Sequence, residues 1–510
     1  MQLVFILIAG FFIRLISLDQ SLWLDEGTTA RVISQYSSAD IITRFSPTDF
    51  HPPLFYLFMK GWTSLFGFSE YILRMPSVFF SLGTGYVIYL IGKELKGTTI
   101  GLWAAALFLF HPLILYYSQE ARMYSMVTFF LTGALWCFVK INPVRSSFPR
   151  TRESSVESLH NGNLLKGKFI AWIPAFAGMT RRVAGMTRRD AGMTISGHSG
   201  LSGIVVKKMH KTPFLWILLF NIFSFLSILT FYGSVFFIGA IYCYLLFKKR
   251  YRVFFQLTIG PGLALLIVSP LLIHQLENAK AGLAAVPHWS SVLGKANLKD
   301  FSLIFIKFST GRISFFPKLI STGLGVVSAL VTFFFVIKGG LNNKKLLVIF
   351  SLPLIFGTVI SFYTPLLQYF RFLYLIPVMC LLMVLGTSKN AQKTLLLGVF
   401  MAWSLSYVLL PQFHREDWQS LARLIPPKAT VVGIPSSLDA FSYYRVDTRI
   451  RDIRTKQVLF ADELYVIPYT FSLYGVSTNS LSTDYQLKEK KVVRGLELEI
   501  WERKTMLSSL

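Results

Sequence analysis

The sequence has little cysteine and little acid. Only three cysteines occur in 510 residues, and each lies inside an apolar run: Cys137, Cys243 and Cys380. They form neither a disulfide framework nor a zinc-ligand spacing. Asp and Glu together number 25 against 51 Lys and Arg, which gives a formal net charge of +26. A basic excess can indicate nucleic-acid binding, but in an apolar chain it belongs more often to loops on the inner side of a membrane. We therefore expect no nucleic-acid partner.

Acidic and basic side chains are also scarce inside the apolar runs. Hydrophobic residues make up 53% of the chain and the mean hydropathy is +0.54, which is typical of a polytopic membrane protein. Runs long enough to cross a bilayer predict about eleven transmembrane helices. They lie near 1–18, 76–92, 98–117, 123–139, 213–231, 232–247, 253–272, 318–337, 346–364, 372–387 and 394–410.

The interior of these runs contains Arg14, near one end, and His111. We expect Arg14 to extend toward the outer interface and Met1–Leu18 to stay attached as the first helix, since it lacks a basic start and a cleavage site. An ion-coupled transporter normally keeps acids or bases at mid-membrane. The apolar spans therefore favour an enzyme that works at the membrane surface, with a transporter or flippase of lipid-linked glycans as the alternative and a non-catalytic scaffold as a third reading.

The basic loops set the orientation. With the N-terminus inside, every inner loop carries Lys or Arg, whereas the first outer loop, 19–75, is slightly acidic. An odd number of spans then places residues 412–510 outside the cytoplasm. Their composition is that of a soluble domain, with an amphipathic helix over His414–Ile425 and strand-like runs ATVVGI, QVLF, LYVIPY and LELEIW. The predicted organisation is a membrane domain over 1–411 and a small α/β domain over 412–510.

A basic inner loop, 141–211, contains AGMT three times at a period of seven. The repeat has no apolar seam, so it is no coiled coil. Its low complexity predicts a disordered insert without a part in the chemistry, and it looks like a translated repetitive DNA element. An arm that binds nucleic acid or lipid headgroups is the alternative.

Charged residues gather on the predicted outer side. The loop 19–75 begins with SLWLDEG, which holds Asp25 and Glu26, and continues with HPPLFYLFMKGW from His51, an apolar segment too short to span and read as an interfacial helix. Arg74 lies at the mouth of the second span. Further candidates on the same side are Glu120, Arg122, Tyr369 and Arg371.

Each of these residues also has a structural interpretation. Asp25 and Glu26 suit the first turn of a helix, and His51 suits the cap of the interfacial helix that begins with it. Arg74 and Arg371 are also typical interface anchors, and Glu120 with Arg122 also fits an ordinary loop ion pair.

Four motifs together resemble a known family. SLWLDEG, HPPLFYLF, LRMPS and YYSQEARMY are similar to motifs of bacterial GT-C fold glycosyltransferases of glycosyltransferase family 39, which includes protein mannosyltransferase-like and aminoarabinose transferase-like proteins. The segment LTFYGS around Tyr232 departs from the Thr-His-Tyr pattern of relatives, which puts any role of that histidine in doubt. The resemblance implies a polytopic helical protein in the bacterial cytoplasmic membrane, a polyprenyl-phosphate-linked sugar donor, and a hydroxyl acceptor on a lipid, a glycan or a protein.

The chemistry of such a donor fits the charged residues. Phosphate is a good leaving group, so the reaction needs a base for the acceptor hydroxyl and positive charge for the phosphate. We expect Asp25 to be the base and Glu26 to orient it or the acceptor. The guanidinium groups of Arg74, Arg122 and Arg371 would hold phosphate.

The remaining candidates are expected at the substrate. Glu120 would order Arg122 or join a metal site, which leaves a divalent metal ion open as a cofactor. His51 and Tyr369 are expected to bind substrate. Direct displacement with one base predicts inversion at the anomeric carbon.

Overall fold

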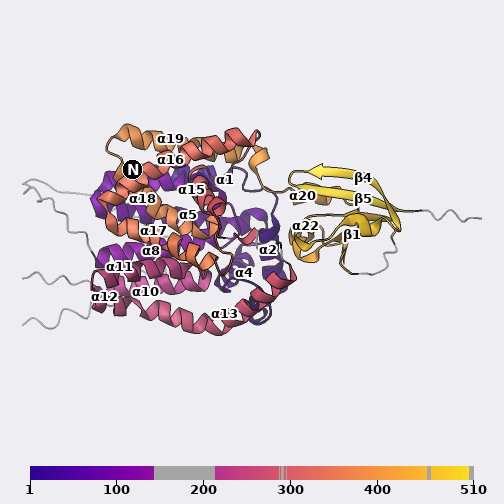
Figure 1. The fold of residues 1–510 in the computed structure, drawn as a ribbon, viewed down its shortest axis with the longest axis horizontal. Coiled ribbons are helices and arrows are strands. Elements are labelled where there is room, and N and C mark those ends of the chain that lie inside the picture. Colours follow the sequence, from indigo (N-terminus) through magenta and orange to yellow (C-terminus); the bar gives the residue numbers. More distant parts are fainter. Residues whose placement is uncertain (143–212, 287, 289–291, 295, 456–460, 505–510) are drawn as a thin grey trace, which may run out of the picture. The chain divides into compact units, whose positions relative to one another are not determined.

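The computed structural model describes residues 1–142, 213–286, 288, 292–294, 296–455 and 461–504 (Figure 1). The predicted insert and the strand-like run QVLF lie outside the described residues. The described residues belong to one compact unit, which contains the long helices and the five-stranded sheet.

The described residues include seven helices that are long and apolar enough to cross a membrane, or eight spans if a bent pair counts as one. The seven are α5 (Glu70–Lys96), α8 (Tyr124–Ile141), α13 (Ile259–Ala285), α16 (Lys318–Asn342), α17 (Lys344–Ser361), η3 with α18 (Tyr369–Leu375 and Ile376–Gly386) and α19 (Asn390–Leu409). The bent pair is α6 (Thr98–Leu109) with α7 (Pro112–Ser118). Three shorter apolar helices, α1 (Gln2–Leu15), α10 (Pro213–Thr230) and α11 (Ser234–Phe247), occupy the other predicted spans. The prediction of a polytopic helical protein is confirmed.

The pair α6 and α7 bends by 62° at His111. Pro112 occupies the first position of α7, where its missing N–H costs nothing. His111 Nδ1 accepts a hydrogen bond from the N–H of Leu113 at 3.2 Å, and its Nε2 lies 2.7 Å from the carbonyl of Phe308. His111 therefore holds a bend in the bundle.

Arg14 does not reach an interface as predicted. Its side chain is fully buried and donates to the carbonyl of Gly10 at 2.7 Å and to Ser81 Oγ of α5 at 3.0 Å. A buried guanidinium requires such acceptors, and α1 packs against α5 closely enough to supply them.

The loop 19–75, which the sequence predicts to lie outside, folds into short helices. These are α2 (Leu24–Gln35), α3 (Ser38–Asp40), η1 (Ile41–Phe45), η2 (Ser46–Thr48) and α4 (Leu54–Phe66). The predicted helix after the two prolines is α4, which ends at Gly67 in a backbone conformation with φ of 95°. That conformation suits glycine, so the helix stops there.

The C-terminal residues form the predicted α/β domain. Its sheet has the order β2-β1-β3-β5-β4, with β1 (Thr430–Gly433) parallel to β2 (Arg449–Asp452) and β3 (Glu463–Val466), and β5 (Leu496–Arg503) antiparallel to β3 and β4 (Tyr485–Val493). Figure 1 shows these strands in orange to yellow. Three of the predicted runs are β1, β3 and β5. The charged edge strand β4 and the strand β2 were not predicted, because neither shows an apolar alternation.

The predicted helix over His414–Ile425 is shorter in the structure. The helix α20 covers only Trp418–Arg423, and Asp417 Oδ1 caps it by accepting from the N–H of Ser420 at 3.0 Å. The capping residue lies inside the predicted range, so the residues before it leave the helix. Arg415 is one of them and is free to enter the site described below.

A short helix of the C-terminal domain, α21 (Asp439–Tyr444), packs directly on α2. A Cβ on Gly27 would lie 2.2 Å from the backbone nitrogen of Ala440, so only glycine permits this approach. Thr28 Oγ1 donates to Asp439 at 2.9 Å, and Arg31 Nε lies 2.8 Å from the other oxygen of Asp439. The helix that carries the acidic pair is thus held from the C-terminal domain.

Candidate active site

The acidic pair lies in the first turn of α2, where the helix dipole favours negative charge. Glu26 is the third helical residue, and its Oε2 accepts a hydrogen bond from the N–H of Trp23 at 3.3 Å. This contact is one half of a capping box. The sequence-based alternative of a helix-capping acid therefore applies to Glu26.

Glu26 is also the centre of a buried ionic cluster. Arg74 donates to both of its oxygens, with Nε at 2.8 Å and Nη2 at 2.6 Å, and Arg415 Nη1 lies 3.1 Å away. The N–H of Ala121 donates at 2.8 Å. Burial alone would raise the pKa of Glu26, but the two guanidinium groups and these hydrogen bonds outweigh it and hold the pKa below its usual value. Glu26 is an ionised, fully paired carboxylate.

Arg74 has no donor left for a phosphate. Besides its two bonds to Glu26, it donates to the carbonyls of Leu18 at 2.7 Å, Gln20 at 2.5 Å and Ser21 at 3.1 Å. These contacts engage all five N–H groups of a guanidinium. The phosphate contact expected for Arg74 therefore has no geometric basis, and its contacts instead fix the segment that leads into α2.

Asp25 differs from its neighbour. Its side chain remains 38% exposed, whereas those of Glu26 and Glu120 are fully buried. Its Oδ2 lies 3.7 Å from Nη2 of Arg122. An accessible carboxylate beside a guanidinium can meet a substrate, which a sealed ion pair cannot.

Arg122 is held from its other side by a chain of side chains. Its Nη1 donates to the hydroxyl of Tyr56 at 3.0 Å, that hydroxyl donates to Asp49 Oδ2 at 3.0 Å, and Asp49 Oδ1 lies 3.4 Å from His51 Nδ1. Burial would raise the pKa of Asp49, but His51, Arg122 and the backbone N–H of Phe50 together outweigh it, and the pKa lies below its usual value. Within the described residues, the buried Nε of Arg122 has no hydrogen-bond partner.

Asp49 and Tyr56 were not among the predicted site residues, although both lie in or next to the HPPLFYLF motif. His51 enters the site through Asp49 and stacks near Phe231, with ring centres 6.4 Å apart. Phe231 stands where the Thr-His-Tyr pattern has its histidine. The neighbouring Tyr232 donates to Gln275 at 2.7 Å, and Gln275 donates to the carbonyl of His51 at 3.1 Å. The divergent segment thus lies beside the His51 ring through Phe231 and supports the His51 backbone through Tyr232 and Gln275.

Glu120 pairs with Arg415 rather than with Arg122 as expected. Arg415 Nη2 lies 3.2 Å from Glu120 Oε2, and the other oxygen is buried without a partner among the described residues. Burial raises the pKa of Glu120 to about 7, against the opposing effect of Arg415.

Arg415 and a further arginine, Arg312, flank the ring of Tyr116. Arg415 Nε donates to its hydroxyl at 2.9 Å and Arg312 Nη1 at 2.7 Å, and both guanidinium groups lie over the ring, at 4.3 and 4.9 Å from its centre. Arg415 is buried, whereas Arg312 is exposed. Arg312 follows α15 (Leu298–Thr310) and belongs to no motif that the sequence offered.

The remaining candidates lie beside the start of α8. Tyr369 is buried, and Arg371 is partly buried and donates to the carbonyl of Pro365 at 3.0 Å. Phe370 between them packs edge to face against Tyr124, with ring centres 5.7 Å apart. The structure thus brings the η3 segment next to the turn that carries Arg122.

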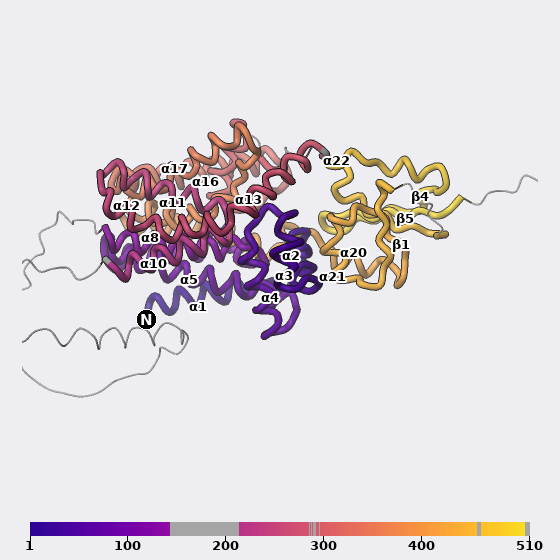
Figure 2. The backbone as a smooth tube through the Cα atoms, turned by 90° about the horizontal axis from the view of Figure 1, so that it is seen from below, coloured from indigo at the N-terminus to yellow at the C-terminus, as the bar shows by residue number. Residues whose placement is uncertain are grey.

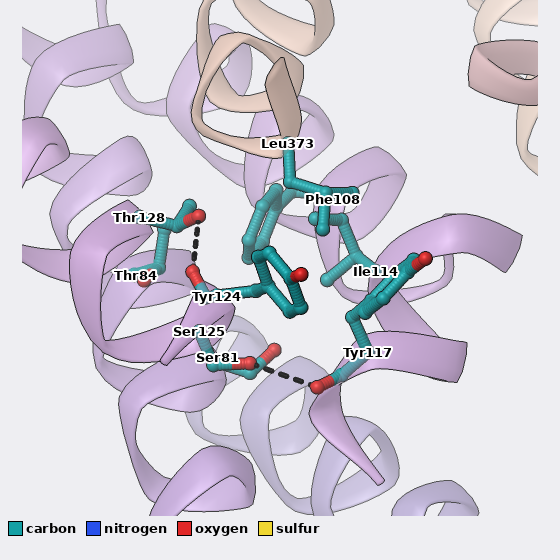
Figure 3. Close-up of a pocket in the computed structure, with 9 residues that line it drawn as sticks. All are labelled: Ser81, Thr84, Phe108, Ile114, Tyr117, Tyr124, Ser125, Thr128 and Leu373. Carbon is teal, nitrogen blue, oxygen red and sulfur yellow. Dashed lines mark hydrogen bonds between the residues drawn. The ribbon is translucent and has the colours of Figure 1, made fainter. Parts of the chain in front are cut away.

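A small cavity lies behind this turn, between α5, α7 and α8 (Figure 3). Its polar groups are largely satisfied by the backbone: Thr128 donates to the carbonyl of Tyr124 at 2.7 Å and Ser125 to that of Tyr117 at 3.2 Å. It lacks charged residues in its lining, which consists of Ser81, Thr84, Phe108, Ile114, Tyr117, Tyr124, Ser125, Thr128 and Leu373. We do not assign substrate to it.

The described residues include no group of three or more His, Cys, Asp or Glu side chains placed to hold a metal ion. The sequence analysis left a divalent metal ion open as a cofactor, and we assign no ligands to it among the described residues.

Comparisons with known proteins bear on the first part of the chain. A sequence profile of the family described as dolichyl-phosphate-mannose-protein mannosyltransferase matches residues 50–145. This range contains His51, Arg74, Glu120 and Arg122, while the acidic pair precedes it. No curated protein matches the chain.

Similar solved structures share little sequence with the chain. ArnT from Cupriavidus metallidurans bound to undecaprenyl phosphate is 12% identical over 99% of both chains, with a TM-score of 0.44. The apo oligosaccharyltransferase from Archaeoglobus fulgidus is 11% identical over 88% of this chain and 64% of its own length, with a TM-score of 0.46.

The resemblance drawn from the motifs is thus matched by a sequence profile over a defined range. That range joins the α4 helix, the arginine of α5 and the turn before α8, which the structure places around one ionic cluster. Over residues 50–145 the chain is similar to the dolichyl-phosphate-mannose-protein mannosyltransferase family, and its resemblance to membrane glycosyltransferases of the GT-C type is confirmed.

Proposed function

We propose that the chain transfers a sugar from a polyprenyl-phosphate donor to a hydroxyl acceptor at the outer face of the bacterial cytoplasmic membrane. The observation that carries the proposal is the position of Asp25. It is a partly exposed carboxylate, 3.7 Å from Arg122, next to a buried cluster that fixes both residues. The family name of the matching profile supports a lipid-phosphate sugar as the donor.

The proposed reaction is a single displacement. The acceptor oxygen attacks the anomeric carbon, and the bond from that carbon to the phosphate oxygen breaks. Asp25 takes the proton of the acceptor hydroxyl, and the departing phosphate oxygen takes the electron pair of the broken bond. Attack opposite to the leaving group inverts the anomeric configuration.

Positive charge for the leaving phosphate comes from arginines with accessible or unpaired donors. Arg122 has an unpaired Nε among the described residues, Arg312 is exposed, and Arg371 is partly exposed. Guanidinium groups match phosphate oxygens in geometry and strengthen hydrogen bonds by their charge. Arg74 and Arg415 are buried in the Glu26 cluster and act as positioning residues.

Glu26 also acts by positioning in this proposal. It ties the first turn of α2 to Arg74 and to the turn before α8 through Ala121, and so sets the separation of Asp25 and Arg122. Tyr56, Asp49 and His51 support Arg122 from the opposite side. Tyr369 is proposed to line the substrate near Arg371.

No step is routed through a metal ion, because the described residues offer no set of three ligating side chains. Turnover measured with a chelator and after addition of Mg²⁺ or Mn²⁺ tests this part. Loss of turnover with the chelator and its recovery with one ion would add a metal to the mechanism.

The outer-face location rests on the basic inner loops and on the odd number of predicted spans. One test fuses to Leu510 a reporter enzyme that works only outside the cytoplasm, and we expect this fusion to give a signal. A reporter active only in the cytoplasm should be silent in the same position, and a signal from it would reverse the orientation.

A release assay tests the function itself. Purified protein given a polyprenyl-phosphate sugar and an acceptor pool should free polyprenyl phosphate, whereas a flippase or a scaffold would leave the donor intact. Mass spectrometry of envelope glycans and glycoproteins in a deletion strain would then identify sugar and acceptor. An intact donor under all conditions would refute the proposal.

A further inference from the structure

A second cluster of charge lies at the opposite end of α8. The candidate active site is at the N-terminal end of this helix, and Asn142 follows its last residue. Eighteen residues at 1.5 Å each separate the two ends by about 27 Å, which is close to the hydrocarbon thickness of a bilayer. The cluster is therefore remote from the proposed sugar transfer.

Asn142 connects two cations there. Arg250 Nη1 donates to its side-chain oxygen at 2.6 Å, and Lys345 Nζ donates to its backbone carbonyl at 3.1 Å. Lys345 also lies over the ring of Phe138, at 4.4 Å from the centre. The cations come from the turn before α12 (Tyr251–Leu257) and from the start of α17, two segments that are distant in sequence (Figures 1 and 2).

The side-chain amide of Asn142 faces this cluster with an unused donor. The residue is 92% buried, and its Nδ2 has no hydrogen-bond partner among the described residues. A buried N–H without a partner costs stability, so an acceptor here would stabilise the site, and the two cations beside it favour an anionic one.

The positive charge of the cluster is not neutralised by the described residues. Neither Arg250 nor Lys345 has an ion pair with a carboxylate in this part of the chain, and the nearby Glu94 is paired with Lys140. The C-terminal end of α8 contributes about half a negative charge, which is less than the positive charge that Arg250 and Lys345 can carry. Lys345 is only 8% exposed, so solvent compensates its charge poorly.

The surroundings of the cluster are apolar and exposed. Phe247, Tyr251 and Phe255, on α11 and α12, are 81%, 53% and 67% exposed. Aromatic side chains at the end of a bundle are typical of the membrane interface, and basic pockets between transmembrane helices at this level bind lipid headgroups. A dissolved anion would gain nothing from these rings.

We propose that Asn142, Arg250 and Lys345 form a binding site for the phosphate of an anionic phospholipid. The phosphate oxygens would accept from Asn142 Nδ2 and from both cations, while the acyl chains would lie against Phe247 and Phe255. The site is independent of the proposed transfer reaction, so either can fail without the other.

The test uses the full chain purified in detergent and stripped of lipid. Native mass spectrometry counts bound phosphatidylglycerol, and the unfolding midpoint is measured with phosphatidylglycerol, with phosphatidylcholine and with inorganic phosphate. We expect phosphatidylglycerol alone to bind and to raise the midpoint. Lys345→Met should weaken its binding at least about fivefold, the effect of one cation at a lipid surface, because Met keeps the apolar stem and removes the charge.

The matched control is Lys338→Met, which removes an exposed charge from α16 and should leave binding unchanged. Arg250→Gln tests the exposed partner and gives the answer if Lys345→Met does not fold. Equal phosphatidylglycerol binding in wild type and in the folded variants would overturn the proposal. Equal stabilisation by phosphatidylcholine or by inorganic phosphate would also overturn it, since the site would then not select an anionic lipid.

Discussion

Glu26→Gln and Asp25→Asn change adjacent acids to their amides, and the structure predicts that only Glu26→Gln also lowers stability. Glu26 receives two hydrogen bonds from Arg74, one from Ala121 and an ion pair from Arg415, all without contact to solvent. In the Glu26→Gln variant the side-chain amide keeps one oxygen and replaces the other by an NH₂ donor, which faces guanidinium N–H groups. The variant therefore leaves two buried cations short of a counter-charge.

The cost of this change follows from the burial of the cluster. Removing one partner of a buried ion pair typically costs about 3–5 kcal/mol, because the remaining charge stays away from water. Glu120 forms its ion pair with Arg415 and none with Arg74, so it does not compensate the charge of Arg74. We expect Glu26→Gln to lower the free energy of unfolding by about this amount, and to lose turnover because the fold around α2 is lost.

Asp25→Asn should behave differently. The side chain is partly exposed and has one long contact, to Arg122 at 3.7 Å, so stability should change by no more than about 0.5 kcal/mol. Loss of a general base typically lowers the rate about 10²- to 10⁴-fold. Donor binding should survive, because the phosphate is held elsewhere.

The assay pairs two measurements on each variant in detergent: the free energy of unfolding from denaturant titration, and polyprenyl phosphate released from the donor. Glu277→Gln, at an exposed acid, is the control and should change neither. A stable but inactive Glu26→Gln protein would move Glu26 from positioning into the chemistry. Near wild-type turnover in folded Asp25→Asn would refute the proposed base.

Four further outcomes follow from the same contacts. Arg122→Ala should weaken donor binding in a titration with polyprenyl-phosphate sugar, and Arg122→Lys should restore it only in part, because an ammonium is a point charge and not a fork; unchanged affinity would return Arg122 to a structural role. Gly27→Ala should cost about 1–3 kcal/mol of stability, since its Cβ would lie 2.2 Å from the backbone of Ala440, and a stable variant would contradict the close approach of α2 and α21. The pKa of Glu120 is raised by burial from 4.5 to about 7, so the stability contributed by its protonated carboxyl is fully present below about pH 4.5 and is lost as the pH rises through about 7. Glu120→Gln should therefore make the unfolding midpoint depend less on pH between these values, and an unchanged pH profile would contradict this. Replacement of Ser146–Gly200, outside the described residues, by a Gly/Ser linker should leave membrane insertion and turnover intact, and their loss would give the insert a function.

Hydropathy and local motifs explain what the sequence could predict. All eleven predicted spans coincide with helices, because length and apolarity are local properties of a segment. The acidic pair and Arg122 came from short motifs, and the structure places them together because those motifs occupy one helix start and one tight turn. The α/β domain was recognised from strands with apolar residues, whereas β4, with its Lys and Glu side chains, gave no such signal.

The roles of the arginines could not be predicted in the same way. Arg74 appeared free to bind phosphate, but its partners include three backbone carbonyls that no side-chain pattern encodes. Arg14 looked like an interface residue until Ser81 of another helix supplied an acceptor. Arg312 and Arg415 reach Tyr116 from almost 200 and 300 positions away in sequence, and such contacts depend on the folded bundle.

The place of Arg415 has a consequence for how the protein is made. Glu26 is synthesised early and lies in the loop 19–75, but one of its two cations arrives only after 389 further residues and the last predicted span. Until then the pocket holds Arg74 alone, and Glu120 lacks its ion pair altogether. The ionic cluster is therefore completed at the end of membrane insertion. A chain that stops before the linker to the C-terminal domain would carry every predicted span and still have an unfinished candidate active site.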